Sequence, residues 1–194
     1  GRPSWRVIIS LPVNARLAPW DLWDEQLPEQ REEANRGFLN RRYRDRPLLI
    51  IPINIRQPRA RGLLYITDQP IPGIGSSGHV DIYVHRMCIK LNDGELLPEW
   101  ATFVRGVIDA EIQPTASRDS LQRDLAYHQL RRELGAAIIQ ALRELQQHDA
   151  EHFIKLCNWH EAGIKGMALR NDEFFAAVAH RLPFATNEGH LTLQ

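Results

Sequence analysis

A long helical run from Ser117 to Gln147 constrains the fold of this chain more than any other segment. Apolar residues recur along it at helical spacing, which places them on one face of a helix. This stripe consists of Leu121, Leu125, Leu130, Leu134, Ile138, Leu142 and Leu145. A helix with one apolar face has to bury that face against another layer of the protein.

Extended runs precede this helix. Residues 48–55 and 62–67 are β-rich and flank the turn Gln57-Pro-Arg-Ala-Arg61, while residues 80–91 predict a third long strand, ended by the turn signal Asn92-Asp-Gly94. Shorter segments add a strand at 7–12, a helix-rich stretch at 20–46, and a short helix followed by extended chain at 98–107. Sheet first and helices afterwards predict an α/β fold of the α+β kind, a mixed β-sheet packed with helices in two layers.

The same order of elements predicts three parts of the chain. Residues 1–147 form one large α/β subdomain that ends in the long helix. Residues 148–186 form shorter helices, and residues 187–194 begin a strand that belongs to a further subdomain.

The composition narrows the class of protein. The 24 basic and 24 acidic residues give a net charge of zero, so nothing suggests attraction to nucleic acid or to a membrane surface. No stretch reaches the roughly 18 apolar residues that a membrane helix needs. Cys88 and Cys157 make no disulfide framework, and both are expected to be small buried hydrophobic residues in a reducing cytoplasm.

The start of the long helix carries the best candidate for chemistry. Pro114 and Thr115 stop regular structure, Ser117 is a good N-cap, and Asp119 suits the first turn of a helix. Arg118 and Gln122 are then expected on one helical face, one turn apart. A guanidinium fork beside an amide donor can hold a phosphate. The alternative is a capped surface helix with a solvated arginine.

Two other motifs favour ordinary structure over a site. Gly73-Ile-Gly-Ser-Ser-Gly78 has the glycine spacing of a dinucleotide-binding loop, but a strand rather than a helix follows, so no helix N-terminus could hold a pyrophosphate. His148 and His152, near Cys157 and His160, match no closed zinc pattern, and solvated polar groups on a helix are favoured. No metal site and no Ser-His-Asp or Cys-His arrangement is predicted.

Several segments, in one order, resemble the heat-shock protein 90 chaperone family of the bacterial HtpG type. The segment Arg105–Gln122 resembles the family's catalytic loop, R-G-V-[VI]-D-S-x-D-L-P-L-N-x-S-R-E-x-L-Q. The segments that resemble other family motifs in the same order are Leu22-Trp23 with Glu32-Glu33 and Phe38, Leu63–Ile66, Ile82–Ile89, Glu95–Trp100 and Leu182–Thr186. The match points to the middle segment of such a chaperone.

The resemblance implies a fold like ribosomal protein S5 domain 2 and a role in ATP hydrolysis. ATP with Mg²⁺ would be bound by a separate N-terminal ATPase domain of the same protein, and Arg118 would reach the γ-phosphate with Gln122 assisting. The parent would be a cytoplasmic homodimer, joined through a C-terminal domain. This fragment alone is expected neither to bind ATP strongly nor to hydrolyse it.

The resemblance also implies contact with unfolded or partly folded client proteins. Trp23, at the family's L-W position, and Trp20 are the candidates for an exposed apolar patch, and the alternative is that both are core residues. The loop before Arg118 is one residue shorter than the family's and lacks its asparagine. A protein-binding scaffold that no longer assists hydrolysis therefore stays open, with an unrelated two-layer α/β enzyme far behind.

Overall fold

The computed structural model describes residues 17–68 and 78–168, together with residues 172, 175–176, 183–186 and 189–192. The strand predicted at 7–12 and most of the glycine motif at 73–78 lie outside the described residues. No described helix is long and apolar enough to cross a lipid bilayer.

A five-stranded mixed sheet forms the centre of the structure, as predicted. Its strands lie in the order β1-β2-β5-β3-β4, and only β3 and β5 pair in parallel. The strands are β1 (Pro47–Arg56), β2 (Arg59–Thr67), β3 (His79–Val84), β4 (Met87–Asp93) and β5 (Val104–Ala110). The predicted runs at 48–55 and 62–67 are β1 and β2, and a turn at Gln57 and Pro58 joins them.

The prediction of one long strand at 80–91 is wrong. The chain instead forms a hairpin, with Val84 paired to Met87 and a two-residue turn between them. His85 and Arg86 occupy this turn with φ values of 49° and 64°. The sequence Asn-Gly or Asp-Gly usually marks such a turn, because both central residues need a positive φ. Here neither residue gives that signal.

The short helix predicted after residue 98 is also wrong, although the extended chain after it is confirmed as β5. Two tight turns replace the helix, closed by hydrogen bonds from Ala101 N to Pro98 O (2.9 Å) and from Val104 N to Ala101 O (3.1 Å). Pro98 favours the start of a turn as readily as the start of a helix.

The long helix is confirmed, but it begins later than predicted. Helix α2 spans Leu125–His148, and the Asp124 carboxylate caps it by accepting a hydrogen bond from Tyr127 N at 2.9 Å. Ser117 is therefore not the N-cap. Leu121 is buried although it precedes the helix, and Leu125 in the first turn is 83% exposed. The apolar stripe thus extends beyond the helix that it predicts.

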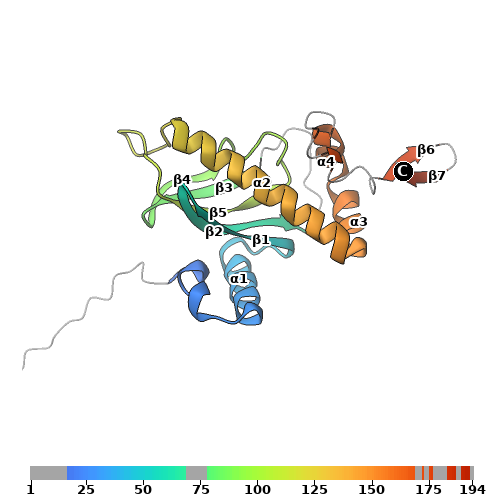
Figure 1. The fold of residues 1–194 in the computed structure, drawn as a ribbon, viewed down its shortest axis with the longest axis horizontal. Helices are drawn as coiled ribbons and strands as arrows, with labels where there is room; N and C mark the ends of the chain where they lie inside the picture. The colour runs from blue at the N-terminus through green and yellow to red at the C-terminus, as the bar shows by residue number, and fades with distance from the viewer. Residues whose placement is uncertain are drawn as a thin grey trace, which may run out of the picture.

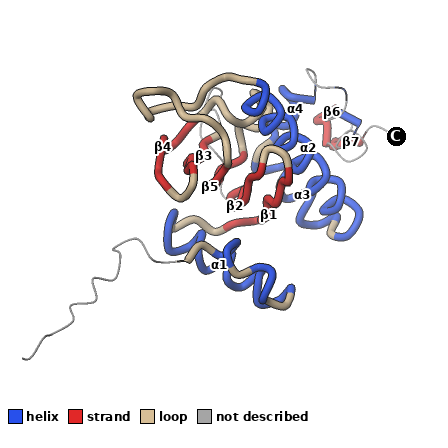
Figure 2. Tube along the Cα trace, turned by 60° about the vertical axis from the view of Figure 1, so that its left-hand side comes forward, coloured by secondary structure: helices blue, strands red, loops and turns tan. Residues whose placement is uncertain are grey.

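Helices cover both faces of the sheet (Figures 1 and 2). Helix α2 lies on one face with α3 (Ala150–Trp159) and α4 (Glu161–Ala168). Helix α1 (Pro28–Tyr43) lies on the other face with the short 3-10 helices η1 (Pro19–Asp21) and η2 (Trp23–Glu25). The helix-rich stretch predicted at 20–46 is confirmed, and it adds a third layer to the two that were predicted.

The two faces carry separate apolar cores because side chains alternate along β2. Leu64 and Ile66 join the core under α2, whereas Leu63 and Tyr65 join the core under α1. Phe153, Leu156 and Cys157 of α3 belong to the first core, so the helices after residue 147 share it with α2. Near the end of the chain, β6 (Pro183–Thr186) pairs with β7 (Gly189–Thr192), which places a strand where the last helical residues were predicted.

A buried carboxylate fastens α1 to the sheet. Asp81 Oδ2 accepts hydrogen bonds from Arg42 Nη2 at 2.6 Å and from the Tyr43 hydroxyl at 2.8 Å, and Asp81 Oδ1 accepts one from Asn92 N at 3.1 Å. Burial raises the pKa of the Tyr43 phenol, which therefore stays a neutral donor. The pairing leaves Asp81 with partners for both oxygens, as a buried charge requires.

Strands β2 and β5 approach closely at two glycines, which generates a first prediction. A Cβ at Gly106 would lie 2.2 Å from Leu63 O, and one at Gly62 would lie 2.1 Å from Val107 O. Gly106→Ala should therefore lower the free energy of unfolding by roughly 3 kcal/mol, the upper end of what overpacking usually costs. Urea denaturation of the parent protein measures this.

Gly37→Ala is the control for that experiment. Gly37 lies inside α1, and a Cβ there would meet only the flexible end of the Arg41 side chain, at 3.2 Å. This substitution should raise stability by roughly 0.5–1 kcal/mol, because alanine favours a helix over glycine. Equal effects of the two substitutions would contradict the close approach of the strands.

Candidate functional site

The candidate site is the loop that joins β5 to α2. Strand β5 runs parallel to β3 and antiparallel to β2. The loop therefore leaves the sheet at the same end as the β1–β2 and β3–β4 turns (Figure 1). The Gln129 amide on α2 donates to Gln57 O at 3.1 Å and ties the β1–β2 turn to the helix that follows the loop.

The loop folds back on itself as a small hairpin. Pro114 and Leu121 form an isolated β-bridge, and Thr115 N donates to Ser120 O at 2.9 Å. A tight turn at the tip is closed by a 2.9 Å hydrogen bond from Arg118 N to Thr115 O. Leu121 is buried in the core under α2, so the base of the loop is anchored while its tip is exposed.

Arg118 lies at the exposed tip of this hairpin. Its φ of 57° is in the left-handed region, which costs a residue with a Cβ roughly 1–2 kcal/mol. No carboxylate of the described residues forms an ion pair with its guanidinium. Strained backbone of this kind persists where surrounding contacts hold it, and it is often found at functional sites.

A carboxylate on the next residue gathers the hydroxyls of the tip. Asp119 Oδ1 lies 2.6 Å from Ser117 Oγ and 3.0 Å from Thr115 Oγ1. The hydrogen bond from the Ser117 hydroxyl, and to a smaller extent that from the Thr115 hydroxyl, lowers the pKa of the Asp119 carboxyl below its ordinary value. The bonds are therefore complete near neutral pH and weaken as the carboxyl is protonated in acid.

Gln122 belongs to the base of the loop. Its backbone N donates to Gln113 O at 2.9 Å, and its Nε2 donates to Pro114 O at 3.0 Å. The prediction that Arg118 and Gln122 project from one helical face is wrong, because α2 starts at Leu125, beyond both residues. The structure brings them into the same hairpin instead, at its tip and its base.

The two tryptophans named as client contacts are core residues in this structure. Trp20 is 6% exposed and Trp23 is 7% exposed, and both belong to the apolar core that contains Leu63, Tyr65 and Val107. Trp23 Nε1 also donates to the buried Asn35 Oδ1 at 3.1 Å. The expected exposed patch of indole rings is therefore not formed. Leu17 and Leu27, which flank the tryptophans in sequence, are 58% and 67% exposed.

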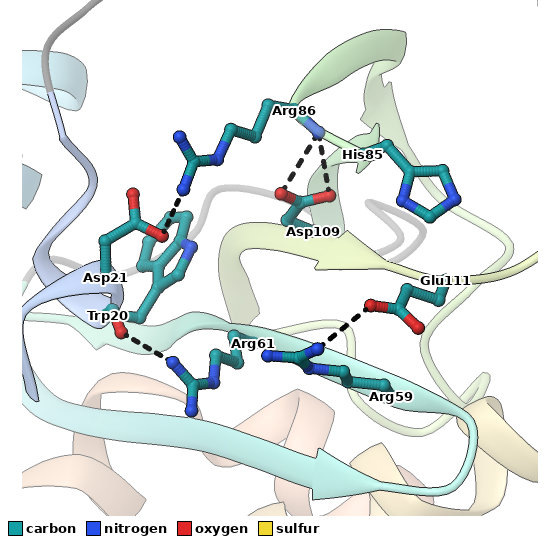
Figure 3. A pocket seen from close by; sticks show the side chains of 8 residues that line it. All are labelled: Trp20, Asp21, Arg59, Arg61, His85, Arg86, Asp109 and Glu111. Atoms are coloured by element: carbon teal, nitrogen blue, oxygen red, sulfur yellow. Dashed lines mark hydrogen bonds and ion pairs between the residues drawn. The ribbon is translucent and has the colours of Figure 1, made fainter. Parts of the chain in front are cut away.

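A polar pocket of about 290 Å³ lies beside η1, at the loop end of the sheet (Figure 3). Its charges neutralise one another: Arg59 pairs with Glu111 at 3.4 Å, and Arg86 pairs with Asp21 at 3.1 Å. No sequence motif predicted this pocket, although Arg59 and Arg61 of β2 and Asp109 of β5 supply part of its lining. Its lining residues are Trp20, Asp21, Arg59, Arg61, His85, Arg86, Asp109 and Glu111. The paired arginines leave no unopposed positive charge here for a phosphate.

The histidines and cysteines form no metal site among the described residues. Nowhere in that part of the chain do three side chains of His, Cys, Asp or Glu lie close enough together to hold a metal ion. His148 Nδ1 lies 2.9 Å from Glu144 O, and His152 Nδ1 lies 2.6 Å from Asp149 Oδ2. Cys157 is buried as predicted, and burial raises its pKa to about 12. The prediction that Cys88 is buried is wrong, because it lies exposed on the edge strand β4.

Comparison with known proteins gives one consistent family. The family model described as "Hsp90 protein" matches residues 67–191. The chaperone protein HtpG of Nocardia farcinica is 30% identical over 145 residues, which cover 70% of this chain and 21% of that protein. The mitochondrial heat shock protein 75 kDa of Rattus norvegicus is 28% identical over 154 residues, covering 74% of this chain and 21% of that protein.

A solved structure shows the same fold. The middle domain of a Plasmodium falciparum heat shock protein superposes with a TM-score of 0.66 at 19% sequence identity, covering 90% of this chain and 70% of that chain. The predicted mixed sheet with helices is thereby confirmed. The chain spans about a fifth of the length of the two curated relatives named above.

The left-handed conformation at the loop tip generates a second prediction. Arg118→Gly should be more stable than Arg118→Ala by roughly 0.5–1 kcal/mol, because glycine adopts a φ of 57° without a Cβ clash. Part of that gain is offset by the greater freedom of glycine in the unfolded chain. Urea denaturation of both variants measures the difference. A more stable alanine variant would mean that residue 118 does not hold this conformation in solution.

Proposed function

Since this chain belongs to the heat-shock protein 90 family, as a middle segment of the HtpG type, we propose that it supplies Arg118 to ATP bound by another domain of the same protein. The parent protein would then be an ATP-dependent molecular chaperone. ATP with Mg²⁺ would be held by a separate N-terminal ATPase domain, and Gln122 would assist Arg118 from within the loop.

The conformation of the loop is the observation that carries this proposal. The Arg118 guanidinium is exposed, forms no ion pair with the described carboxylates, and projects from a hairpin whose base is anchored by buried Leu121. A guanidinium offered by a neighbouring domain stabilises the charge that develops on a transferring phosphoryl group. Closure of the two domains would then couple hydrolysis to a change in the shape of the chaperone.

The partners follow from the same proposal. The N-terminal ATPase domain would dock against the end of the sheet that carries the loop, and a C-terminal domain would join two copies of the parent into a homodimer. We place the parent in the cytoplasm. Unfolded or partly folded proteins would be its clients.

Client contact near Trp20 and Trp23 remains part of the proposal, in a changed form. Because both rings are buried, they would support the segment from the core side, and the exposed Leu17 and Leu27 would offer the apolar surface. Replacing a buried tryptophan by alanine costs about 3–5 kcal/mol. A client-binding experiment therefore has to leave both tryptophans in place, since their loss would unfold the segment.

The second candidate function is a protein-binding scaffold that keeps the fold without assisting hydrolysis. The shortened loop favours it, because the reach of Arg118 toward another domain depends on the length of the hairpin. The two functions differ in whether turnover depends on Arg118.

Removal of the Arg118 guanidinium tests the proposed function. In the full-length parent, Arg118→Ala should lower the turnover number for ATP by roughly 10²-fold or more, because the transition state loses its cation. The affinity for ATP should stay within about twofold of wild type, since another domain holds the nucleotide. Steady-state hydrolysis and nucleotide titration measure both quantities.

Arg123→Ala is the matched control for that experiment. Arg123 is an exposed arginine five positions away along the chain, and its Nη2 pairs with Glu95 Oε2 at 2.7 Å. Its removal should leave turnover close to wild type, because its charge is already engaged. Equal turnover in Arg118→Ala and wild type would reject the proposed function and favour the scaffold.

The isolated chain provides a further check. We expect residues 1–194 alone to hydrolyse no ATP above background, because the proposal assigns nucleotide binding to another domain. A malachite green assay at millimolar ATP measures phosphate release. Turnover by the isolated chain that Arg118→Ala leaves unchanged would place a nucleotide site elsewhere in these residues and contradict the assignment.

A further inference from the structure

We propose that Asp119 is a positioning residue for Arg118, and that Gln122 assists by closing the base of the loop rather than by contacting the phosphate. This inference rests on the proposed function, because it explains how the loop holds a guanidinium ready for a phosphate that another domain brings. Both residues would hold the hairpin in position, Asp119 at its tip and Gln122 at its base.

The contacts at the tip converge on one carboxylate oxygen. Asp119 Oδ1 lies within hydrogen-bond distance of the hydroxyls of Ser117 and Thr115, at 2.6 Å and 3.0 Å. Thr115 and Ser117 precede Arg118 in sequence, and Asp119 follows it. The backbone of Arg118 therefore lies between side chains that hydrogen-bond to each other and bracket it, while its own N donates to Thr115 O.

The bracket accounts for the backbone conformation at Arg118. A residue with a Cβ leaves the left-handed region unless its neighbours hold it there. Here a turn closed at Thr115 precedes Arg118, and a carboxylate that faces back toward the turn follows it. The low pKa of Asp119 fits this arrangement, because the charged form is the better acceptor for both hydroxyls.

The contacts at the base are made by Gln122. Its backbone N and its side-chain Nε2 donate to the carbonyls of two consecutive residues, Gln113 and Pro114. The amide is therefore engaged across the base of the hairpin, at the opposite end from Arg118. Buried Leu121 fixes the same end against the core. A glutamine placed in this way sets where the hairpin leaves the sheet.

The exact position of the Arg118 guanidinium would affect the rate at which it assists a reaction of a phosphate held by another domain. A displacement of about 1 Å at a reacting group can cost roughly 10²-fold in rate. Catalytic groups are accordingly held by neighbouring packing and hydrogen bonds, and exposed arginines without such support lose their geometry. The bonds of Asp119 and Gln122 supply that support to a loop whose tip is otherwise open to solvent.

A double-mutant cycle in the full-length parent tests the inference. Asp119→Ala and Gln122→Met are each made in wild type and in Arg118→Ala, and the turnover number and KM for ATP are measured for all. In wild type we expect each substitution to lower turnover roughly tenfold or more, with KM within about twofold. In Arg118→Ala we expect no further loss, because no guanidinium remains to be positioned.

Two controls separate positioning from general damage. Asp119→Asn keeps an oxygen that both hydroxyls can reach, so it should restore most of the turnover lost in Asp119→Ala. Gln140→Met removes an exposed glutamine of α2 whose Nε2 bonds to Glu144 Oε1 at 2.8 Å, and it should leave turnover unchanged. Thermal unfolding midpoints should be alike for all variants, since all four substituted side chains are exposed.

The outcomes distinguish this inference from the proposed function. Wild-type turnover in Arg118→Ala would overturn the proposed function, and the positioning roles with it. A large loss in Arg118→Ala beside wild-type turnover in Asp119→Ala would overturn the role of Asp119 alone. A loss in Gln122→Met that multiplies with that of Arg118→Ala would show that Gln122 acts independently of Arg118, and it would overturn the positioning role of Gln122. Failure of Asp119→Asn to restore turnover would reject the hydrogen-bonded bracket.

Discussion

The close pairing of β2 with β5 is the constraint on which the rest of the structure depends. Gly62 and Gly106 let the two backbones approach where any Cβ would collide with a carbonyl oxygen of the facing strand. This pairing brings β5 into the middle of the sheet, between an antiparallel and a parallel neighbour. The loop of residues 111–124 and helix α2 follow directly from β5, so they take their position from that strand.

The sheet also separates two apolar cores, one on each face, and each core stabilises a different part of the structure. The core under α2 is the larger one and anchors the base of the loop through Leu121. The smaller core under α1 holds both tryptophans and is fastened by the bonds of Arg42 and Tyr43 to Asp81. Because the smaller core is tied by a buried charge, its helix cannot slide on the sheet without leaving that carboxylate unpaired.

The sequence predicted the elements whose signal extends over a whole segment and missed those that depend on local competition. The β-rich composition of residues 48–55 and 62–67 predicted β1 and β2, and helical spacing of apolar residues predicted α2. The β3–β4 turn was missed because His85 and Arg86 adopt positive φ values, although neither residue type is typical of a two-residue hairpin turn. The helix start was misplaced because Ser117 and Asp124 are both good caps, and the structure uses Asp124, with Leu121 buried ahead of the helix.

That shift in the helix start changes what Arg118 can do. In the first turn of a helix, its guanidinium would lie beside the backbone N–H groups and one turn away from Gln122. At the tip of a hairpin it stands away from the helix, and Asp119 is occupied by hydroxyls instead of capping N–H groups. A hairpin tip can enter a cleft in another domain, which the side of a helix cannot do without moving the whole helix. Under the proposed function, the reach of Arg118 would come from the hairpin, and the hydrogen bonds at its two ends would set the direction of the guanidinium.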